Sequence, residues 1–476
     1  MSTTATSAVL HRTLRREFPR IIGGEGNYVI LEDGRRIFDA SGGAAVACIG
    51  HGDARVHDAI ATQLKQISYC STIFYTTDVY EKLCQELVDS THGVMKRAYI
   101  VNSGSEAMEA AMKLARQYYL EKDPPEPNRV RFIAREHSYH GITLGSLSLG
   151  GHVMRREKFE PILLDCVSRV SRCFPFRDKL ADETESAYVA RLADELDQEF
   201  RRVGADTVCA FVAEPIVGAA LGCVPFVPGY LKAMREVCDK HGALFIADEV
   251  MCGMGRSGTY HAWELEKDGN VAPDIQTLGK CLGGGYQPIA GVLASKRVIE
   301  AFEKGTGSFV HGHTYQGHPV ACAAALQVQK IIRDDNLVQN VSKMGGLLSA
   351  RLKDLLASHP NVGDIRGSGL FWGVEFVTDK TTNKPFPSSL GVASGIAELG
   401  LTKPYCIAVY PSSGTADGIN GDHIIISPPY NISPADVEII ANTVHKLVMD
   451  YFASRSLEIN ADFRSSEVVK RIGTRE

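Results

Sequence analysis

The sequence predicts an α/β fold in which a mainly parallel sheet is covered by helices. From about residue 53 to residue 330, short apolar runs alternate with segments of helical periodicity. This alternation is typical of parallel strands joined by crossover helices. The expected strands span residues 98–101, 130–134, 208–213, 243–247 and 289–294.

The two ends of the chain predict a smaller α+β unit. Residues 27–39 are expected to form a hairpin that turns at Glu32-Asp-Gly34. After residue 334 we expect helices over 345–358 and 436–447, and a strand over 373–377. The resulting division has an N-terminal part of a small domain in residues 1–60, a large cofactor-binding domain in 61–330 and the rest of the small domain in 331–476.

Residues 403–422 are interpreted as a long loop. This stretch contains Pro404 and Pro411 together with three glycines. Structureless segments of such length usually carry function, so we expect it to form one wall of a substrate entrance.

Composition narrows the class of protein. The 476 residues are 44% hydrophobic and 22% charged, with a formal net charge of −5, as in ordinary large globular enzymes. The charge gives no reason to expect nucleic acid or an anionic membrane as a partner. No run approaches eighteen apolar residues, so no membrane span is expected. The twelve cysteines lack any C-x-x-C pair and are interpreted as reduced, intracellular thiols.

A carboxylate at a strand end and a lysine in a glycine-rich loop form the candidate catalytic pair. The apolar run 243–247 ends on Asp248, and Lys280 follows in Gly-Lys-Cys-Leu-Gly-Gly-Gly. Pyridoxal phosphate needs an amine that forms a Schiff base and a carboxylate that keeps a proton on its pyridine nitrogen. Taken singly, each residue also fits a solvated lysine or a carboxylate that caps a turn.

A turn of small residues supplies a third element. Asn102-Ser-Gly-Ser105 separates the strand expected at 98–101 from a helix expected over 106–119, and Ser103 with Glu106 fits a capping box. Free N–H groups and the helix dipole favour an anion at such a position. Local pattern alone leaves two readings open, an ordinary capped helix and a phosphate site.

Together these elements resemble the class III pyridoxal-phosphate-dependent aminotransferases, the omega-amino-acid and amine transaminase family. The resemblance runs from Phe38 to Tyr430, and the order and spacing of its motifs are those of the family. It implies the pyridoxal-phosphate-dependent transferase fold of type I. Further matching segments are Ser138-Tyr-His-Gly141, Val212-Ala-Glu-Pro-Ile216, Gly253-Met-Gly-Arg-Ser-Gly258, Gly312-His-Thr-Tyr315 and Ile365-Arg-Gly-Ser-Gly369.

The resemblance implies a role for each candidate site residue. Lys280 and Asp248 are the expected catalytic residues, and Ser103, Gly104 and Ser105 are expected at the cofactor phosphate. Tyr139 and Val250 are expected to cover the two faces of the cofactor ring, with Glu214 nearby. Half-buried packing remains open for Tyr139, and a turn cap remains open for Glu214.

The resemblance also implies a homodimer with shared active sites. Thr314 is the residue expected to reach the phosphate bound in the partner subunit. Phe74 and Tyr75 are interpreted as part of an apolar substrate wall or as ordinary packing.

Three positions depart from the branch that uses ornithine and 4-aminobutyrate. Met251, Ala219 and Ile425 stand where that branch carries Gln, Glu and Arg. In that branch the Glu and the Arg form a pair, and their joint loss is coherent because either charge left alone and buried would be costly. No arginine lies between Tyr405 and Tyr430 either. We therefore expect pyruvate rather than 2-oxoglutarate as acceptor.

The expected activity is transfer of an amino group from a primary amine or omega-amino acid to a keto acid, with ping-pong kinetics. The open alternatives on the same fold are a racemase, a decarboxylating transaminase, an aminomutase and a phospho-lyase. A metal enzyme centred on His311, His313 and His318 is a further alternative, although no cysteine or carboxylate in that segment completes a ligand set. A catalytically inactive binding protein is disfavoured by intact Lys280 and Asp248.

The N-terminal segment bears on localisation. Arg12, Arg15, Arg16 and Arg20 stand against a single acid, Glu17, which is typical of a mitochondrial presequence. The family resemblance already starts near His11, and the remaining ten or so residues are short for such a signal. We expect a cytoplasmic protein rather than a mitochondrial one.

Overall fold

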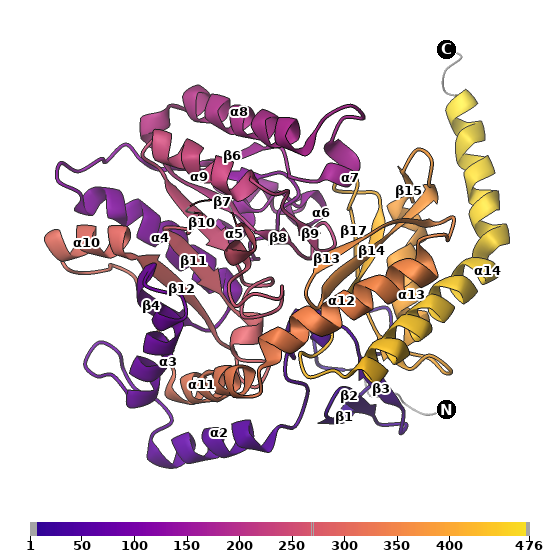
Figure 1. Ribbon diagram of the computed structural model, residues 1–476, viewed down its shortest axis with the longest axis horizontal. Helices are drawn as coiled ribbons and strands as arrows, with labels where there is room; N and C mark the ends of the chain where they lie inside the picture. The colour runs from indigo at the N-terminus through magenta and orange to yellow at the C-terminus, as the bar shows by residue number, and fades with distance from the viewer. Residues whose placement is uncertain (1–6, 268, 270, 473–476) are drawn as a thin grey trace.

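A seven-stranded sheet forms the centre of the larger lobe (Figure 1). In this computed structural model, residues 7–267, 269 and 271–472 are described, with side chains as far as residue 455. Residues 1–6, part of the segment considered as a targeting signal, lie outside the described residues. In spatial order the strands are β4 (Met95–Val101), β12 (Ala290–Ser295), β11 (Ile275–Leu278), β10 (Leu244–Asp248), β7 (Val208–Ala213), β5 (Arg131–Arg135) and β6 (Val167–Val170).

The sheet is mainly parallel, as the sequence predicts. Only β12 runs antiparallel to its neighbours β4 and β11, while the pairs β11–β10, β10–β7, β7–β5 and β5–β6 are parallel. The five expected strands are present, that over residues 208–213 with the expected bounds and the other four with shifted ends. The sequence analysis missed β6 and β11, because each has four residues of which only two are apolar, Val-Ser-Arg-Val and Ile-Gln-Thr-Leu.

Helices bury both faces of this sheet. Leu244 and Ile246 of β10 pack into a cluster with α4 (Gly104–Glu121), whereas Phe245 and Ala247 face the opposite cluster. That second cluster contains side chains of α8 (Glu185–Val203) and α9 (Tyr230–Lys240). A strand buried on both faces has no polar alternation, which explains why β10 is apolar up to Asp248.

Further helices complete the larger lobe. Around the sheet edge at β4 lie α2 (Ala54–Gln66), α3 (Asp78–Asp89) and α11 (Pro319–Asp334), and α2 and α3 both pack against α11. The remaining short elements are α1 (Gly42–Ala45), α5 (Leu144–Leu149), α6 (Val153–Arg156), η1 (Glu160–Ile162), α7 (Pro175–Asp178), η2 (Ala205–Thr207), β8 (Ile216–Val217), β9 (Val224–Pro225), η3 (Ala262–Leu265), η4 (Lys280–Leu282) and α10 (Lys296–Lys304).

The smaller lobe combines both ends of the chain (Figure 1). One sheet has the order β1 (Ile21–Glu25), β2 (Tyr28–Leu31), β3 (Arg36–Asp39) and β16 (Ile407–Ala408), so residues near both termini share a ladder. A second sheet is formed by β13 (Val362–Ser368), β14 (Phe371–Asp379), β18 (Asp422–Ile426) and β17 (Tyr410–Ser413), with β15 (Lys384–Pro385) paired to β14. Its helices are α12 (Leu337–Leu356), η5 (Ser388–Leu390), α13 (Val392–Gly400) and α14 (Pro434–Ile472).

The predicted hairpin, the strand over 373–377 and both C-terminal helices are therefore present, with longer helices than expected. The domain boundaries at residues 60 and 330 stay a prediction.

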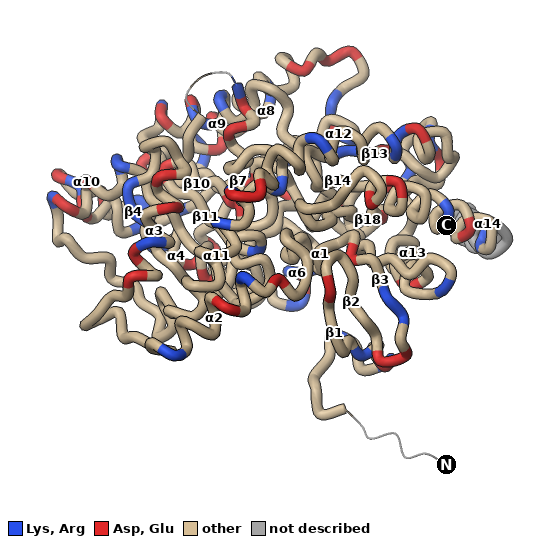
Figure 2. Tube along the Cα trace, turned by 60° about the horizontal axis from the view of Figure 1, so that its bottom comes forward, with Lys and Arg blue, Asp and Glu red and all other residues tan. Residues whose placement is uncertain are grey.

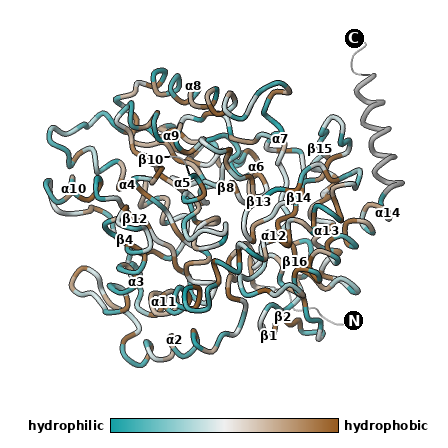
Figure 3. Tube along the Cα trace, in the orientation of Figure 1, coloured by the Kyte–Doolittle hydropathy of each residue, from teal (hydrophilic) through white to brown (hydrophobic). Residues whose placement is uncertain are grey.

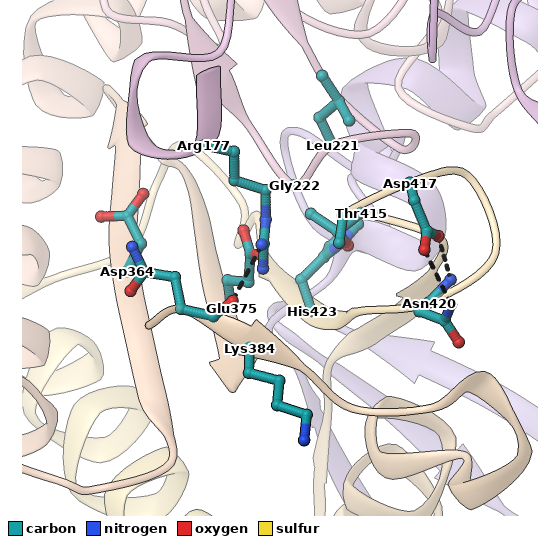
Figure 4. Close-up of polar contacts among 12 residues, drawn as sticks. Arg177, Leu221, Gly222, Asp364, Glu375, Lys384, Thr415, Asp417, Asn420 and His423 are labelled. Carbon is teal, nitrogen blue, oxygen red and sulfur yellow. Dashed lines mark hydrogen bonds and ion pairs between the residues drawn. The ribbon is translucent and has the colours of Figure 1, made fainter. Parts of the chain in front are cut away.

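The expectation of a structureless loop over residues 403–422 was wrong. The segment contains β16 and β17, and β17 pairs with β18 from Tyr410 to Ser413. Pro411 suggested a loop, but β17 lies at an edge of its sheet, where a proline without an N–H group is tolerated. The turn after β17 is closed by Asn420, whose side-chain nitrogen donates to Asp417 at 2.8 Å (Figure 4).

The distribution of charged and apolar residues follows the layers of the fold. Lys and Arg alternate with Asp and Glu along outer helices such as α8 and α10 (Figure 2). Apolar segments gather among the central strands and around β14 and α13, while α2 and α8 carry long hydrophilic stretches (Figure 3). In the parts of the chain that the structure describes, no helix combines the length and the apolar character needed to cross a membrane.

Candidate active site

A cavity of about 390 Å³ lies at one edge of the seven-stranded sheet. Its lining contains Ser103, Gly104, Ser105, Tyr139, Glu214, Asp248, Val250 and Lys280. These residues follow the carboxyl ends of β4, β5, β7, β10 and β11, which all point to the same edge. Open α/β sheets place their ligands at such an edge. The structure thus brings together the residues that the sequence analysis selected from five separate segments.

Asp248 is held by three hydrogen bonds. Its Oδ1 accepts from the backbone N–H of Val250 and from the hydroxyl of Thr277, each at 3.1 Å. Nδ1 of His140 lies 2.8 Å from Oδ2, and the His140 side chain is fully buried. These contacts fix the orientation of the carboxylate at the cavity.

The sequence analysis missed His140 and Thr277. His140 stands inside the matching segment Ser138-Tyr-His-Gly141, but no pattern in the sequence linked it to a carboxylate 108 positions away. Thr277 lies in β11, the strand that was not recognised. Knowing that β11 pairs with β10 would have placed Thr277 opposite Asp248.

Lys280 adopts a strained backbone conformation directly after β11. Its φ of 45° lies in the left-handed region that residues with a Cβ rarely occupy. Burial lowers the pKa of Lys280 below its ordinary value because the ammonium loses solvation, while the negative charge of Asp248 opposes that shift. The net shift makes the neutral amine easier to reach than it is for an exposed lysine. Observed strain of this kind often marks functional positions.

The turn before α4 forms the predicted capping box. Ser103 Oγ accepts from the N–H of Glu106 at 3.2 Å, and Glu106 Oε2 accepts from the N–H of Ser103 at 3.1 Å. The next N–H groups, of Gly104 and Ser105, belong to the first turn and lie outside the helix's own hydrogen-bond ladder. A Cβ on Gly104 would approach Val250 Cγ1 to 2.6 Å, so the tight packing at this position requires glycine.

Glu214 combines both readings that the sequence left open. Its Oε2 accepts from the backbone N–H of Tyr139 at 3.1 Å, and its Oε1 accepts from that of Gly218 at 3.3 Å. Burial raises its pKa above the ordinary value for glutamate. The side chain therefore ties two loops together while it lines the cavity.

Part of the cavity wall is apolar. Met251 and Ile216 line the cavity and pack in one buried hydrophobic cluster with Ala219, Phe371 and Ile425, which are not among the lining residues. Met251, Ala219 and Ile425 are the three positions where the sequence analysis noted missing polar groups. They lie far apart in sequence, and the fold brings them together. A carboxylate borders this cluster, because Glu249 Oε2 accepts from the N–H of Ala262, a member of the cluster, at 2.6 Å.

Three predicted residues do not line the cavity of their own chain. Phe74, Tyr75 and Thr314 are all exposed, with 74% of Phe74 and 70% of Tyr75 accessible. Their segments are neighbours, because the rings of Tyr69 and Tyr315 are 5.9 Å apart. The segment before Phe74 and the segment of Thr314 therefore approach each other at this ring pair.

The histidine-rich segment shows no metal-binding arrangement. His311 Nδ1 lies 3.1 Å from Nζ of Lys113, and burial together with that cation lowers the pKa of His311 to about 4. Across the described residues, no group of three or more His, Cys, Asp or Glu side chains is arranged to hold a metal ion.

Comparisons with known proteins agree with this geometry. The family model described as aminotransferase class III matches residues 15–448. The chain is 50% identical over 441 residues to a Gibberella zeae protein named aminotransferase, covering 92% of this chain and 86% of the relative. It is 34% identical to the chloroplastic gamma aminobutyrate transaminase 3 of Solanum lycopersicum, covering 90% of this chain and 79% of that one.

Solved structures are similar as well. The amine transaminase from an uncultivated Pseudomonas species, in its PLP-bound internal aldimine form, superposes with a TM-score of 0.84. The two sequences are 32% identical, and the match covers 94% of this chain and 97% of that chain.

Proposed function

This chain belongs to the class III aminotransferases, pyridoxal-5′-phosphate-dependent enzymes of fold type I, and on that premise we propose that it transfers an amino group from a primary amine or omega-amino acid to pyruvate. The observation that carries the proposal is the mixed lining of one cavity. Lys280 and Asp248 line it together with Met251 and Ile216, which belong to a hydrophobic cluster that includes Ala219 and Ile425. We call Lys280 and Asp248 with their partners the polar end of the site, and this cluster its apolar end.

The residues at the polar end fit the cofactor. An amine with a lowered pKa, an oriented carboxylate and a glycine that leaves no room for a Cβ are the donor set and the shape that a pyridine ring and a phosphate require. We assign the phosphate to the N–H groups of Gly104 and Ser105 and the Ser105 hydroxyl at the start of α4, with Ser103 as the cap. Tyr139 and Val250 are assigned to the ring faces, with Glu214 beside them.

The cofactor and the protein supply different parts of the proposed reaction. When bound, pyridoxal phosphate supplies an aldehyde that condenses with amines and a ring that withdraws electrons from the substrate. Lys280 holds the cofactor through its amine and moves a proton to or from the reacting carbon, for which it must be neutral. Asp248, fixed by His140, Thr277 and the N–H of Val250, keeps a proton on the ring nitrogen.

The assembly that we propose is a homodimer with shared active sites. Its support is the exposed surface of Phe74, Tyr75 and Thr314, because large apolar side chains that gather on one face usually mark an interface. Ile73 and Val310 extend it, with 84% and 80% of their surfaces accessible. In the dimer Thr314 contacts the phosphate in the partner subunit, and Phe74 and Tyr75 contribute to its substrate wall.

Pyruvate is proposed as acceptor because the apolar end offers no partner for a second carboxylate. Ile425 is fully buried and Ala219 is 5% exposed, so a charge beside them would be desolvated without compensation. Ping-pong kinetics follow if donor and acceptor use this one cavity in turn. We keep the cytoplasm as the predicted compartment, to be tested by imaging a fluorescent fusion.

Two measurements test the proposed function. Purified protein with cofactor should be yellow, and borohydride reduction followed by peptide mapping should place the label on Lys280. A panel of amines and omega-amino acids incubated with pyruvate should yield alanine, with parallel lines in double-reciprocal plots. A label on another lysine would contradict the site, and failure to form alanine with every donor would contradict the reaction.

A further inference from the structure

A keto acid carries a carboxylate, and the cavity provides no arginine to bind it. Lys280 is the only Lys or Arg among the lining residues that the structure describes, and its amine is already committed to the chemistry. We propose that Arg155, on α6, binds the carboxylate of the acceptor at the mouth of the cavity. This inference rests on the proposed function, because it assumes a keto acid as substrate.

Arg155 lies against a residue of the cavity wall. Its guanidinium carbon is 4.4 Å from the ring centroid of Tyr139, which lines the cavity. The side chain is half-buried. No carboxylate of the described residues forms an ion pair with it. A guanidinium that rests on an aromatic ring is partly desolvated and oriented, yet its N–H groups remain available for a two-pronged contact with a carboxylate.

Nearby arginines are occupied by other groups. Arg256, which follows the loop of Met251, is fully buried and donates to the carbonyls of Leu370 and Pro428 at 3.0 and 2.6 Å. Arg172 pairs with Asp178 at 2.8 Å and also donates to carbonyls of the turn after β17. Removing either from these partners would leave buried carbonyl groups unsatisfied.

Four further arginines near the site also have partners. Arg135 is fully buried and donates to the carbonyl of Glu214 at 2.6 Å. Arg177 pairs with Glu375 on β14 (Figure 4), and Arg366 pairs with the same carboxylate. Arg156, the neighbour of Arg155 in sequence, pairs with Glu160 and donates to three carbonyl oxygens. Arg156 is thus held in place by the fold, whereas its neighbour Arg155 has no carboxylate partner among the described residues.

A second arginine, Arg12, also affects the pKa of Tyr139. Burial raises the pKa of Tyr139, and the positive charges of Arg155 and then Arg12 oppose that rise. Arg12 is exposed in the N-terminal segment, whereas Arg155 is in ring contact. The stronger burial and the direct contact favour Arg155 as the carboxylate ligand. Arg12 is the alternative that the experiment must separate.

The experiment compares substrates that differ only in carrying a carboxylate. Arg155→Gln, Arg155→Lys and Arg12→Gln are prepared as holoenzymes, with Arg20→Gln as a remote, exposed control. Steady-state constants are measured for pyruvate and for propanal, an acceptor without a carboxylate, using one shared donor. Binding of propanoate and of its neutral analogue propanamide is measured by calorimetry, which requires no turnover.

We expect Arg155→Gln to lower kcat/KM for pyruvate by about 10- to 100-fold, mainly through KM, because a charge-assisted contact is lost. The constants for propanal should stay within about twofold, and propanoate affinity should fall by a similar factor to the pyruvate effect while propanamide is unaffected. Arg155→Lys should retain part of the binding.

Equal losses for pyruvate and propanal in Arg155→Gln would overturn the inference, because they would indicate a purely structural role. A pyruvate-specific loss confined to Arg12→Gln would also overturn it. If wild type binds propanoate through Arg155 but converts neither acceptor, the proposed function fails and the assignment of Arg155 as a carboxylate ligand stands.

Discussion

The two ends of the cavity differ in the interactions that hold their side chains, which are hydrogen bonds at the polar end and apolar packing at the other. At the polar end, Asp248 accepts three hydrogen bonds and Glu214 accepts two, so the charged and polar groups are fully oriented. At the apolar end, Met251 lines the cavity and packs in one cluster with Ala219 and Ile425, and none of these three side chains carries an N–H or O–H group.

In the proposed function, this difference assigns catalysis to one end and substrate selection to the other. The polar end would serve any amine, because its groups would act on the cofactor and on the reacting carbon. The apolar end would exclude a second carboxylate, since it cannot solvate that charge. The first two predictions below remove a group from the polar end and add a charge to the apolar end, and the next two test the titration of Lys280 and the shared phosphate site.

Removing the amine of Lys280 should have the largest effect. Lys280→Ala should lower kcat by at least about 10⁴-fold, because both covalent attachment and proton transfer are lost. Single-turnover and steady-state rates measure the change. Lys296→Ala, an exposed lysine at the start of α10, is the matched control and should retain full activity. An active Lys280→Ala protein with native thermal stability would contradict the assignment.

Adding a charge to the apolar end should destabilise the fold. Ile425→Arg places an unpaired cation in a fully buried position of β18 and should reduce the free energy of unfolding by about 3–5 kcal/mol. Ala219→Glu on the same chain should recover part of that loss, because the two side chains lie in one cluster and can pair. Denaturant unfolding of the two single variants and the double variant forms the test. Strict additivity would show that the positions are not coupled.

The rate should depend on pH through Lys280. Its pKa is lowered by burial, and only the neutral amine accepts the proton from substrate. The rate should therefore rise with pH up to that pKa and fall about tenfold per unit below it. A profile of kcat against pH at saturating substrate measures this dependence. A rate that decreases steadily from acid to neutral pH would contradict a neutral lysine as the base.

Thr314 should give the smallest of these effects. Thr314→Ala removes one hydroxyl from the proposed phosphate site of the partner subunit and should weaken cofactor retention by about tenfold. Equilibrium dialysis of the cofactor measures it, with Thr306→Ala as a control at another hydroxyl whose partner is Glu121. Full activity in a demonstrably monomeric form would contradict shared sites.

The sequence was sufficient for the parts of the molecule that depend on local pattern. The alternation of apolar runs predicted the parallel sheet, and the capping box at Ser103 and Glu106 was confirmed atom by atom. Asp248 and Lys280 were predicted as the catalytic pair because a strand end and a glycine loop are local signals, and that role stays a prediction. Their convergence on one cavity is a consequence of strand order, which puts the ends of β10 and β11 side by side.

Other features depend on long-range pairing and could not be read from the chain. Only the folded chain brings His140 into hydrogen-bond distance of Asp248 and Arg155 onto the ring of Tyr139. The fold also places Ala219 and Ile425 in one cluster. Residues 403–422 were misassigned because proline and glycine suggest a loop, although Pro411 lies in the edge strand β17 and the glycines follow it in the turn. Thr314 is exposed and does not line the cavity of its own subunit, so its role stays a prediction.

The most direct test of the account is a comparison of acceptors. With one shared donor, kcat/KM is measured for pyruvate and for 2-oxoglutarate, which differ by a second carboxylate and the chain that carries it. The account predicts that pyruvate is preferred, because the cluster of Met251, Ala219 and Ile425 cannot pair that second charge. A clear preference for 2-oxoglutarate would contradict the division of the cavity into a polar catalytic end and an apolar selective end.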